Sequence, residues 1–186
     1  QQSSAATKAS TVSYKTAAVR TISFWYNKLE YSDTNSHIMT GLFLGMIPHD
    51  SPLGVLGFVN EVNSTRPLGL IVSVVEKNEL DGEGYWFTKM VTPEEWRCKG
   101  VDHHLIEMED FTAEVDIKAS IETIKKMRAC IMAGNAVFIH CKAGRARSAM
   151  FCAIYLCLYV NNPETGKRYT FEEAIERLKD AREQVK

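Results

Sequence analysis

Residues 136–148 read AVFIHCKAGRARS, and this stretch decides the fold. Ala136–His140 is almost entirely apolar, which is typical of a strand covered on both faces of a parallel sheet. From Arg147 an apolar run continues to Val160, which predicts a buried helix. A strand, a short loop and a helix therefore follow one another. Backbone N–H groups of such a loop and the positive end of the helix converge on one spot, which suits an anion.

Three other short apolar runs are predicted as strands, namely Leu42–Ile47, Leu70–Val75 and His104–Met108. Helical patterns lie between the strands. A helix over Asp116–Ala133 is predicted because apolar groups recur on one face, at Ile117, Ile121, Ile124, Met127 and Ile131. A last helix is predicted after Thr170, which forms a capping box with Glu173. Strands that alternate with helices indicate an α/β fold, with a central, largely parallel twisted sheet flanked by helices.

The composition is that of a globular protein. The 186 residues are 45% hydrophobic and 24% charged, with a net charge of −1, so no nucleic-acid partner is expected. The five cysteines form no CxxC pair, which argues against a disulfide framework or structural zinc and favours a reducing intracellular compartment. The longest apolar run, Ala149 to Val160, is too short to span a bilayer. No metal or cofactor is expected.

Residues 1–20 contain few large apolar groups and are predicted to form a flexible arm. Residues 21–186 are predicted to form a single catalytic domain, with the aromatic cluster at 24–26 anchoring its start. Residues 1–29 carry four basic and no acidic residues, so a targeting segment and a disordered leader are both open readings.

The loop itself predicts thiolate chemistry on a phosphate. The helix end and nearby cations favour the reactive thiolate of Cys141, and the planar fork of Arg147 can hold two phosphate oxygens. Ser148 is expected to donate to the thiolate, and His140 to orient the loop through hydrogen bonds. The phosphate-binding loop is expected to comprise Lys142, Ala143, Gly144, Arg145, Ala146 and Arg147.

The segment His140–Ser148 resembles the signature His-Cys-x5-Arg-Ser/Thr of the protein tyrosine phosphatase superfamily, of the dual-specificity type. HCKAGRARS is most similar to the mitochondrial PTP-like subfamily, which dephosphorylates phosphatidylglycerophosphate. In place of that subfamily's Glu-Glu-Tyr-Glu motif, this chain has Val75-Glu76-Lys77-Asn78. The resemblance implies a phosphomonoester hydrolase with a phosphocysteine intermediate. It also implies that a mitochondrial location is open beside a cytoplasmic or membrane-associated one.

Phosphate-ester cleavage needs a proton for the leaving oxygen. Asp110 follows the predicted strand His104–Met108, and ligand sites in α/β sheets lie beyond the carboxyl ends of strands. We expect Asp110 to be the general acid, in the Asp-x-Thr context that the resemblance implies. Its competitors are Glu109, Glu114 and Asp116.

The charge of the loop bears on the substrate. Lys142 and Arg145 add two cations to Arg147, which favours a strongly anionic substrate such as a phosphoinositide or phosphatidylglycerophosphate, with peripheral membrane contact. The pattern HCKAG-x-x-R also resembles the phosphoinositide 3-phosphatase tumour suppressor class. Two alternatives stay open: a dual-specificity protein phosphatase that acts on phosphotyrosine, phosphoserine or phosphothreonine, and a catalytically silent phosphate-binding module. The sequence leaves the oligomeric state open.

Overall fold

The computed structural model describes residues 26–29, 41–48, 51–62, 65–81, 90–110, 112, 114–182 and 185. In sequence order the strands are β1 (Tyr26–Leu29), β2 (Leu42–Met46), β3 (Leu68–Val75), β4 (Asp102–Glu107) and β5 (Ala136–Cys141). The helices are α2 (Leu53–Val62), α3 (Lys77–Leu80), α4 (Pro93–Arg97), α5 (Ile117–Met132), α6 (Arg147–Tyr159) and α7 (Phe171–Ala181).

The strands form one sheet in the order β1-β2-β5-β3-β4. β1 runs antiparallel to β2, and the other neighbours pair in parallel. β5 therefore lies in the middle of the sheet, with its carboxyl end between those of β2 and β3. The predicted α/β architecture with a largely parallel sheet is confirmed.

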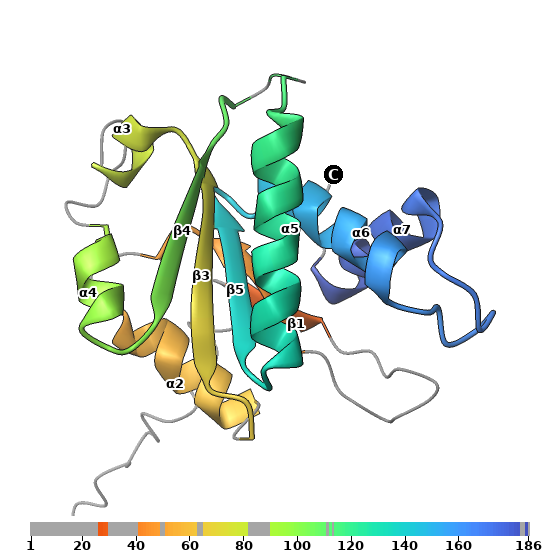
Figure 1. Ribbon diagram of the computed structural model, residues 1–186, viewed down its shortest axis with the longest axis horizontal. Coiled ribbons are helices and arrows are strands. Elements are labelled where there is room, and N and C mark those ends of the chain that lie inside the picture. Colours follow the sequence, from red (N-terminus) through yellow and green to blue (C-terminus); the bar gives the residue numbers. More distant parts are fainter. Residues whose placement is uncertain are drawn as a thin grey trace, which may run out of the picture.

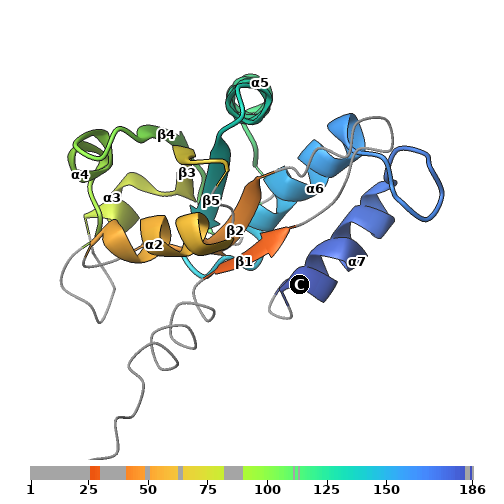
Figure 2. The ribbon, with the colours of Figure 1, turned by 90° about the horizontal axis from the view of Figure 1, so that it is seen from below.

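Helices cover both faces of the sheet (Figures 1 and 2). One face packs against α5, α6 and α7, and its core includes Val72, Ile139 and Leu156. The other face packs against α2 and α4, and its core includes Phe138 and Trp96. Because both faces are covered, every side chain of β5 is buried, as the apolar run predicted.

The four predicted strands and three predicted helices are present, with ends shifted by one or two residues. Thr170 and Glu173 form the predicted capping box at the start of α7. β1, α2, α3 and α4 were not predicted, because these elements are short or lack a clear apolar period. The predicted arm at residues 1–20 lies outside the described residues, as do Phe24 and Trp25 of the aromatic cluster.

The predicted helix α5 is present, but not every residue of its apolar face is buried. Ile124, Met127 and Ile131 are buried, but Ile117 and Ile121 are 72% and 49% exposed. Figure 1 shows that the first turns of α5 extend beyond the ends of the strands, so the sheet does not cover them. The apolar period is correct for the helix, but the length of the covering sheet decides which residues are buried.

Candidate active site

The loop between β5 and α6 is flanked by Cys141 and Arg147, the two residues predicted to act on phosphate. Cys141 is the last residue of β5, and Arg147 is the first residue of α6. Ser148 Oγ donates a hydrogen bond to Cys141 Sγ at 3.2 Å. Cys141 is 4% exposed, so its sulfur lies at the bottom of the loop rather than on the surface. The predicted contact between Ser148 and the sulfur is therefore present.

Gly144 allows the loop to turn against the neighbouring strand. Its φ of 64° lies in the left-handed region that side chains disfavour. A Cβ atom built there would collide with the carbonyl group of Gly45 on β2. The loop is also tied to this strand end by the N–H of Ile47, which donates to the Lys142 carbonyl oxygen at 3.3 Å. The loop geometry thus depends on glycine at position 144.

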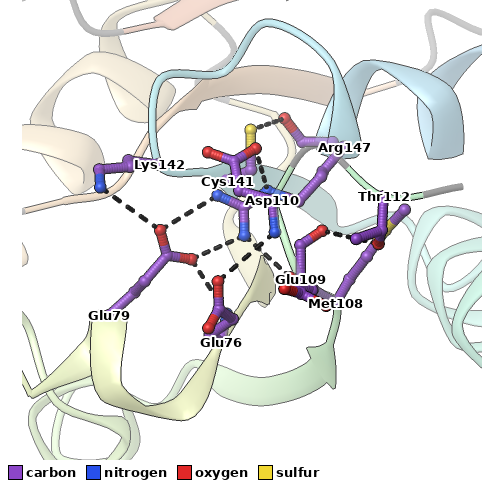
Figure 3. A network of polar contacts seen from close by, with 10 residues as sticks. Glu76, Glu79, Met108, Glu109, Asp110, Thr112, Cys141, Lys142 and Arg147 are labelled. Carbon is purple, nitrogen blue, oxygen red and sulfur yellow. Dashed lines mark hydrogen bonds and ion pairs between the residues drawn. The ribbon is translucent and has the colours of Figure 1, made fainter. Parts of the chain in front are cut away.

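Arg147 is buried, with 4% of its side chain exposed, and Glu79 balances its positive charge. Its Nη1 donates to Glu79 Oε2 at 2.6 Å and its Nη2 to Glu79 Oε1 at 3.2 Å. Nη1 also donates to the Met108 carbonyl oxygen at 2.9 Å. Burial alone would lower the pKa of Arg147, but the bonds to Glu79 outweigh it and raise that pKa. One edge of the guanidinium is therefore held by protein acceptors (Figure 3).

The other edge of the guanidinium faces Asp110. Arg147 Nε makes no hydrogen bond within the described residues, and it lies 3.3 Å from Asp110 Oδ1 as an ion pair. Figure 3 shows Asp110, Arg147 and Cys141 pointing toward one another. The side chain of Asp110 is 33% exposed, and its backbone N–H lies 3.4 Å from Glu76 Oε1. Asp110 thus lies at the mouth of the loop, at the sheet edge where sequence analysis predicted it.

Asp116, one of the alternatives to Asp110 as general acid, has a structural role. Asp116 is the N-cap of α5 and accepts a hydrogen bond from the Ala119 N–H at 3.0 Å. The carbonyl oxygen of Glu109 accepts from the Thr112 hydroxyl at 3.4 Å. The assignment of Asp110 as the acid remains a prediction.

Sequence analysis missed Glu79. This residue is 5% exposed, lies on the short helix α3, and caps that helix together with Glu76. Burial would raise the pKa of Glu79, but hydrogen bonds from Arg147 and from the Glu76 N–H lower it. The segment Glu76-Lys77-Asn78-Glu79 keeps acidic residues at the first and fourth positions of the Glu-Glu-Tyr-Glu motif, so the signal was present in the sequence.

The two additional cations of the loop lie in different surroundings. Lys142 Nζ is 3.8 Å from Glu79 Oε1, and the Lys142 side chain is 43% exposed. Arg145 is exposed. Ala146 is the N-cap of α6, and its carbonyl oxygen accepts from the Met150 N–H at 2.9 Å. Both cationic side chains are therefore accessible from solvent.

A buried chain of hydrogen bonds lies behind the loop. His140 Nε2 is 2.7 Å from Ser73 Oγ, which in turn lies 2.8 Å from His103 Nε2. Burial lowers the pKa of His140 to about 3 and that of His103 to about 4, so both rings are neutral near pH 7. His104 points to the opposite face of the sheet, toward Thr123 on α5. Neither Ser73 nor His103 was predicted from the sequence to support the site.

Among the described residues, no group of three or more His, Cys, Asp or Glu side chains is arranged to hold a metal ion. In the same part of the chain, every helix is too short or too polar to cross a bilayer.

The catalytic domain of dual specificity phosphatases matches residues 63–186, about two thirds of the chain. The chain belongs to this family, which confirms the resemblance noted in the sequence.

Two curated relatives share part of the chain. One is the phosphatidylglycerophosphate phosphatase PTPMT1 of Arabidopsis thaliana, 25% identical over 63% of this chain and 33% of its own length. The other is phosphatidylglycerophosphatase and protein-tyrosine phosphatase 1 of Mus musculus, 32% identical over 50% of this chain and 45% of its own length. The chain thus spans less than half the length of either relative.

Several solved structures share the fold. A crystal structure of PTPMT1 matches with a TM-score of 0.61 and 23% identity, over 87% of this chain and 85% of that chain. PTPMT1 in complex with PI(5)P matches with a TM-score of 0.60 and 22% identity, over 87% and 86%. Kinase associated phosphatase, crystallised with serine in place of its catalytic cysteine, matches with a TM-score of 0.61 and 20% identity, over 84% and 83%. These likenesses show that the fold is that of dual-specificity phosphatases.

Proposed function

We propose that this chain is a cysteine-dependent phosphomonoester hydrolase that acts on a phosphorylated lipid. The observation that carries the proposal is the convergence of a sulfur, a guanidinium and a carboxylate on one loop. Ser148 Oγ lies 3.2 Å from Cys141 Sγ, and Arg147 Nε lies 3.3 Å from Asp110 Oδ1. A thiolate nucleophile, an oxyanion clamp and a proton donor are the three groups that this chemistry needs.

In the first step, the thiolate of Cys141 attacks phosphorus, and a sulfur–phosphorus bond forms as the phosphorus–oxygen ester bond breaks. Arg147 and the loop N–H groups stabilise the charge on the equatorial oxygens. Asp110 donates its proton to the leaving oxygen, so the alcohol departs neutral.

In the second step, water attacks the phosphocysteine. The ionised Asp110 takes a proton from that water, inorganic phosphate leaves, and the sulfur departs as a thiolate. The hydrogen bond from the Ser148 hydroxyl stabilises the departing thiolate, since a charge-assisted bond is stronger than a neutral one. His140 holds the base of the loop through Ser73.

The charge of the loop and the names of the relatives both support a lipid substrate. Lys142 and Arg145 place two solvent-accessible cations beside Arg147, which suits a headgroup with more than one negative charge. Both curated relatives carry phosphatidylglycerophosphate phosphatase activity in their names, and a structural neighbour was crystallised with PI(5)P. A lipid substrate also requires peripheral contact with a membrane. The mitochondrial location remains a prediction from the resemblance.

A substrate panel tests this proposal. Phosphatidylglycerophosphate and phosphoinositides in mixed micelles are compared with phosphotyrosine and phosphothreonine peptides. We expect the highest kcat/KM for one of the lipids. Faster turnover of peptides than of every lipid would overturn the lipid assignment and leave the dual-specificity protein phosphatase, which the name of the mouse relative also supports.

The two loop cations provide a sharper test. Replacing Lys142 and Arg145 with glutamine should lower kcat/KM for the best lipid at least tenfold more than for para-nitrophenyl phosphate, whose single phosphate needs only Arg147. Lys179→Gln, which removes a cation from an exposed pair on α7, is the matched control. Equal losses on both substrates would argue against a headgroup role for the two cations.

A catalytically silent phosphate-binding module is the remaining alternative. Turnover of para-nitrophenyl phosphate under reducing conditions separates the two. We expect the wild type to turn over and Cys141→Ser to be inactive while still binding inorganic phosphate. Phosphate binding without any wild-type turnover would favour the silent module.

A further inference from the structure

Arg182 lies directly behind the phosphate loop, although it belongs to the other end of the domain. It is the C-cap of α7 and is only 3% exposed. Its Nε donates to the Gly144 carbonyl oxygen at 2.9 Å, and its Nη2 donates to the Ala143 carbonyl oxygen at 3.1 Å. A buried arginine thus joins the C-terminal helix to two successive peptide groups of the loop.

These two hydrogen bonds affect which way the peptide groups of the loop point. A loop that wraps an anion turns its N–H groups inward, so its carbonyl groups point outward. Gly144 is buried, and a buried carbonyl without a donor costs free energy. The rigid guanidinium fork of Arg182 satisfies two neighbouring carbonyl groups in one plane, whereas a lysine ammonium is a single point on a flexible stem.

Arg182 also adds charge behind the loop. Burial lowers the pKa of Arg182, and the positive charge of Arg145 acts in the same direction. The negative charge of Cys141 acts in the opposite direction, so the guanidinium and the sulfur interact electrostatically. An arginine keeps its proton at physiological pH even when it is buried. Arg182 therefore contributes a fixed positive charge to the outer side of the cradle.

The surrounding packing fixes where Arg182 lies. Its N–H donates to the Leu178 carbonyl oxygen at 2.8 Å, and its own carbonyl oxygen accepts from the Val185 N–H at 3.0 Å. Leu178 and Val185 are both buried in the core that α7 shares with α6. The guanidinium is thus anchored by packing on both sides along the chain.

We infer that Arg182 is a positioning residue of the phosphate loop. By holding the Ala143 and Gly144 carbonyl groups, it orients the same two peptide units so that their N–H groups, those of Gly144 and Arg145, face the phosphate. This inference rests on the proposed function. Arg182 acts through the loop and does not touch the reacting atoms.

The experiment measures binding of inorganic phosphate by calorimetry in a Cys141→Ser background, so that no turnover is needed. Arg182→Met and Arg182→Lys are compared with Lys179→Met, which removes a charge from an exposed pair on the same helix. We expect Arg182→Met to weaken phosphate binding at least tenfold. Arg182→Lys should recover part of the loss, and Lys179→Met should stay within twofold of the parent.

Thermal unfolding of each variant separates positioning from folding. Phosphate affinity equal to that of the parent in folded Arg182→Met would overturn the inference. If Arg182→Met does not fold, Arg182→Lys decides: a folded protein with weakened phosphate binding supports the inference, and one with parental affinity overturns it. Failure of the wild type to hydrolyse any ester would refute the proposed function but would leave this binding comparison intact.

Discussion

The charge of Arg147 must be balanced inside the protein, because the side chain is almost closed to solvent. Glu79 balances it through two hydrogen bonds of 2.6 and 3.2 Å. This arrangement fixes the orientation of the guanidinium and leaves Nε directed at Asp110. Glu79 is therefore expected to act on a bound phosphate through Arg147 and Lys142, whereas Asp110 is the predicted proton donor.

Glu79→Gln should destabilise the fold by about 3 kcal/mol, because Arg147 stays buried and loses its nearest counterion. Inorganic phosphate should recover part of that stability by acting as a replacement counterion for Arg147. Urea unfolding with and without phosphate measures both effects. Glu94→Gln, which breaks an exposed pair with Arg97, is the control and should change stability by less than about 1 kcal/mol. A Glu79→Gln variant as stable as Glu94→Gln would contradict the compensating role.

Asp110→Asn should slow the hydrolysis of phenyl phosphate about a hundredfold or more, because a poor leaving group depends on general acid catalysis. Para-nitrophenolate leaves without a proton, so the loss on para-nitrophenyl phosphate should be much smaller. Steady-state kcat values on the two esters provide the measurement. Equal losses on both would assign the proton to another group, with Glu109 and Glu114 as the next variants to examine.

At the scale of elements, the loop works because β2 and the β5–α6 junction approach closely. Gly144 makes this approach possible, since a Cβ atom at position 144 would collide with the carbonyl group of Gly45. The Ile47 N–H fixes the loop to the end of β2 through the Lys142 carbonyl oxygen. The loop is therefore held on one side by β2 and on the other by α7 through Arg182.

Gly144→Ala should abolish phosphate binding and cost several times more stability than Gly166→Ala. Both glycines have left-handed backbones, with φ of 64° and 68°, so each substitution carries a strain of about 1–2 kcal/mol. A Cβ atom at Gly166 meets nothing within 4 Å, whereas one at Gly144 collides with Gly45. Thermal unfolding and phosphate calorimetry on the pair isolate the collision from the strain. Equal losses in the two variants would show that the loop tolerates the added methyl group.

At the scale of the whole molecule, a chain of three side chains ties adjacent strands together. Ser73 on β3 bridges His140 on β5 and His103 on β4. Both histidines are held neutral by burial, which lowers their pKa values to about 3 and about 4. Unfolding exposes both rings to water, where each takes up a proton below about pH 6.5.

Stability should therefore fall as the pH drops from 7.5 to 5.5. Below about pH 6.5 the unfolded chain binds more protons than the folded one, so the free energy of unfolding decreases until the folded-state pKa values are approached. Urea unfolding at several pH values measures the slope, and His103→Asn should make it shallower. An unchanged free energy of unfolding across this range would contradict the neutral, buried state of the two rings.

The strand, loop and helix around Cys141 could be predicted from the sequence alone, because the information that specifies them is local. The spacing of Cys141 and Arg147, the left-handed turn at Gly144 and the buried run of β5 all lie within a dozen residues. The order of apolar runs also predicted the α/β class, and the position of Asp110 after β4 followed from the rule that sites form at carboxyl ends of parallel strands.

Only the tertiary structure decided which distant groups support the loop. Glu79 lies 68 residues from Arg147, and Arg182 lies 38 residues from Gly144. The exposure of Ile117 and Ile121 likewise depends on where the sheet ends. The spacing of apolar residues shows which side of a helix or strand is apolar. A buried charge or carbonyl group, in contrast, is paired with a residue that the folded chain brings near. That residue can lie far away in the sequence, so no local pattern reveals it.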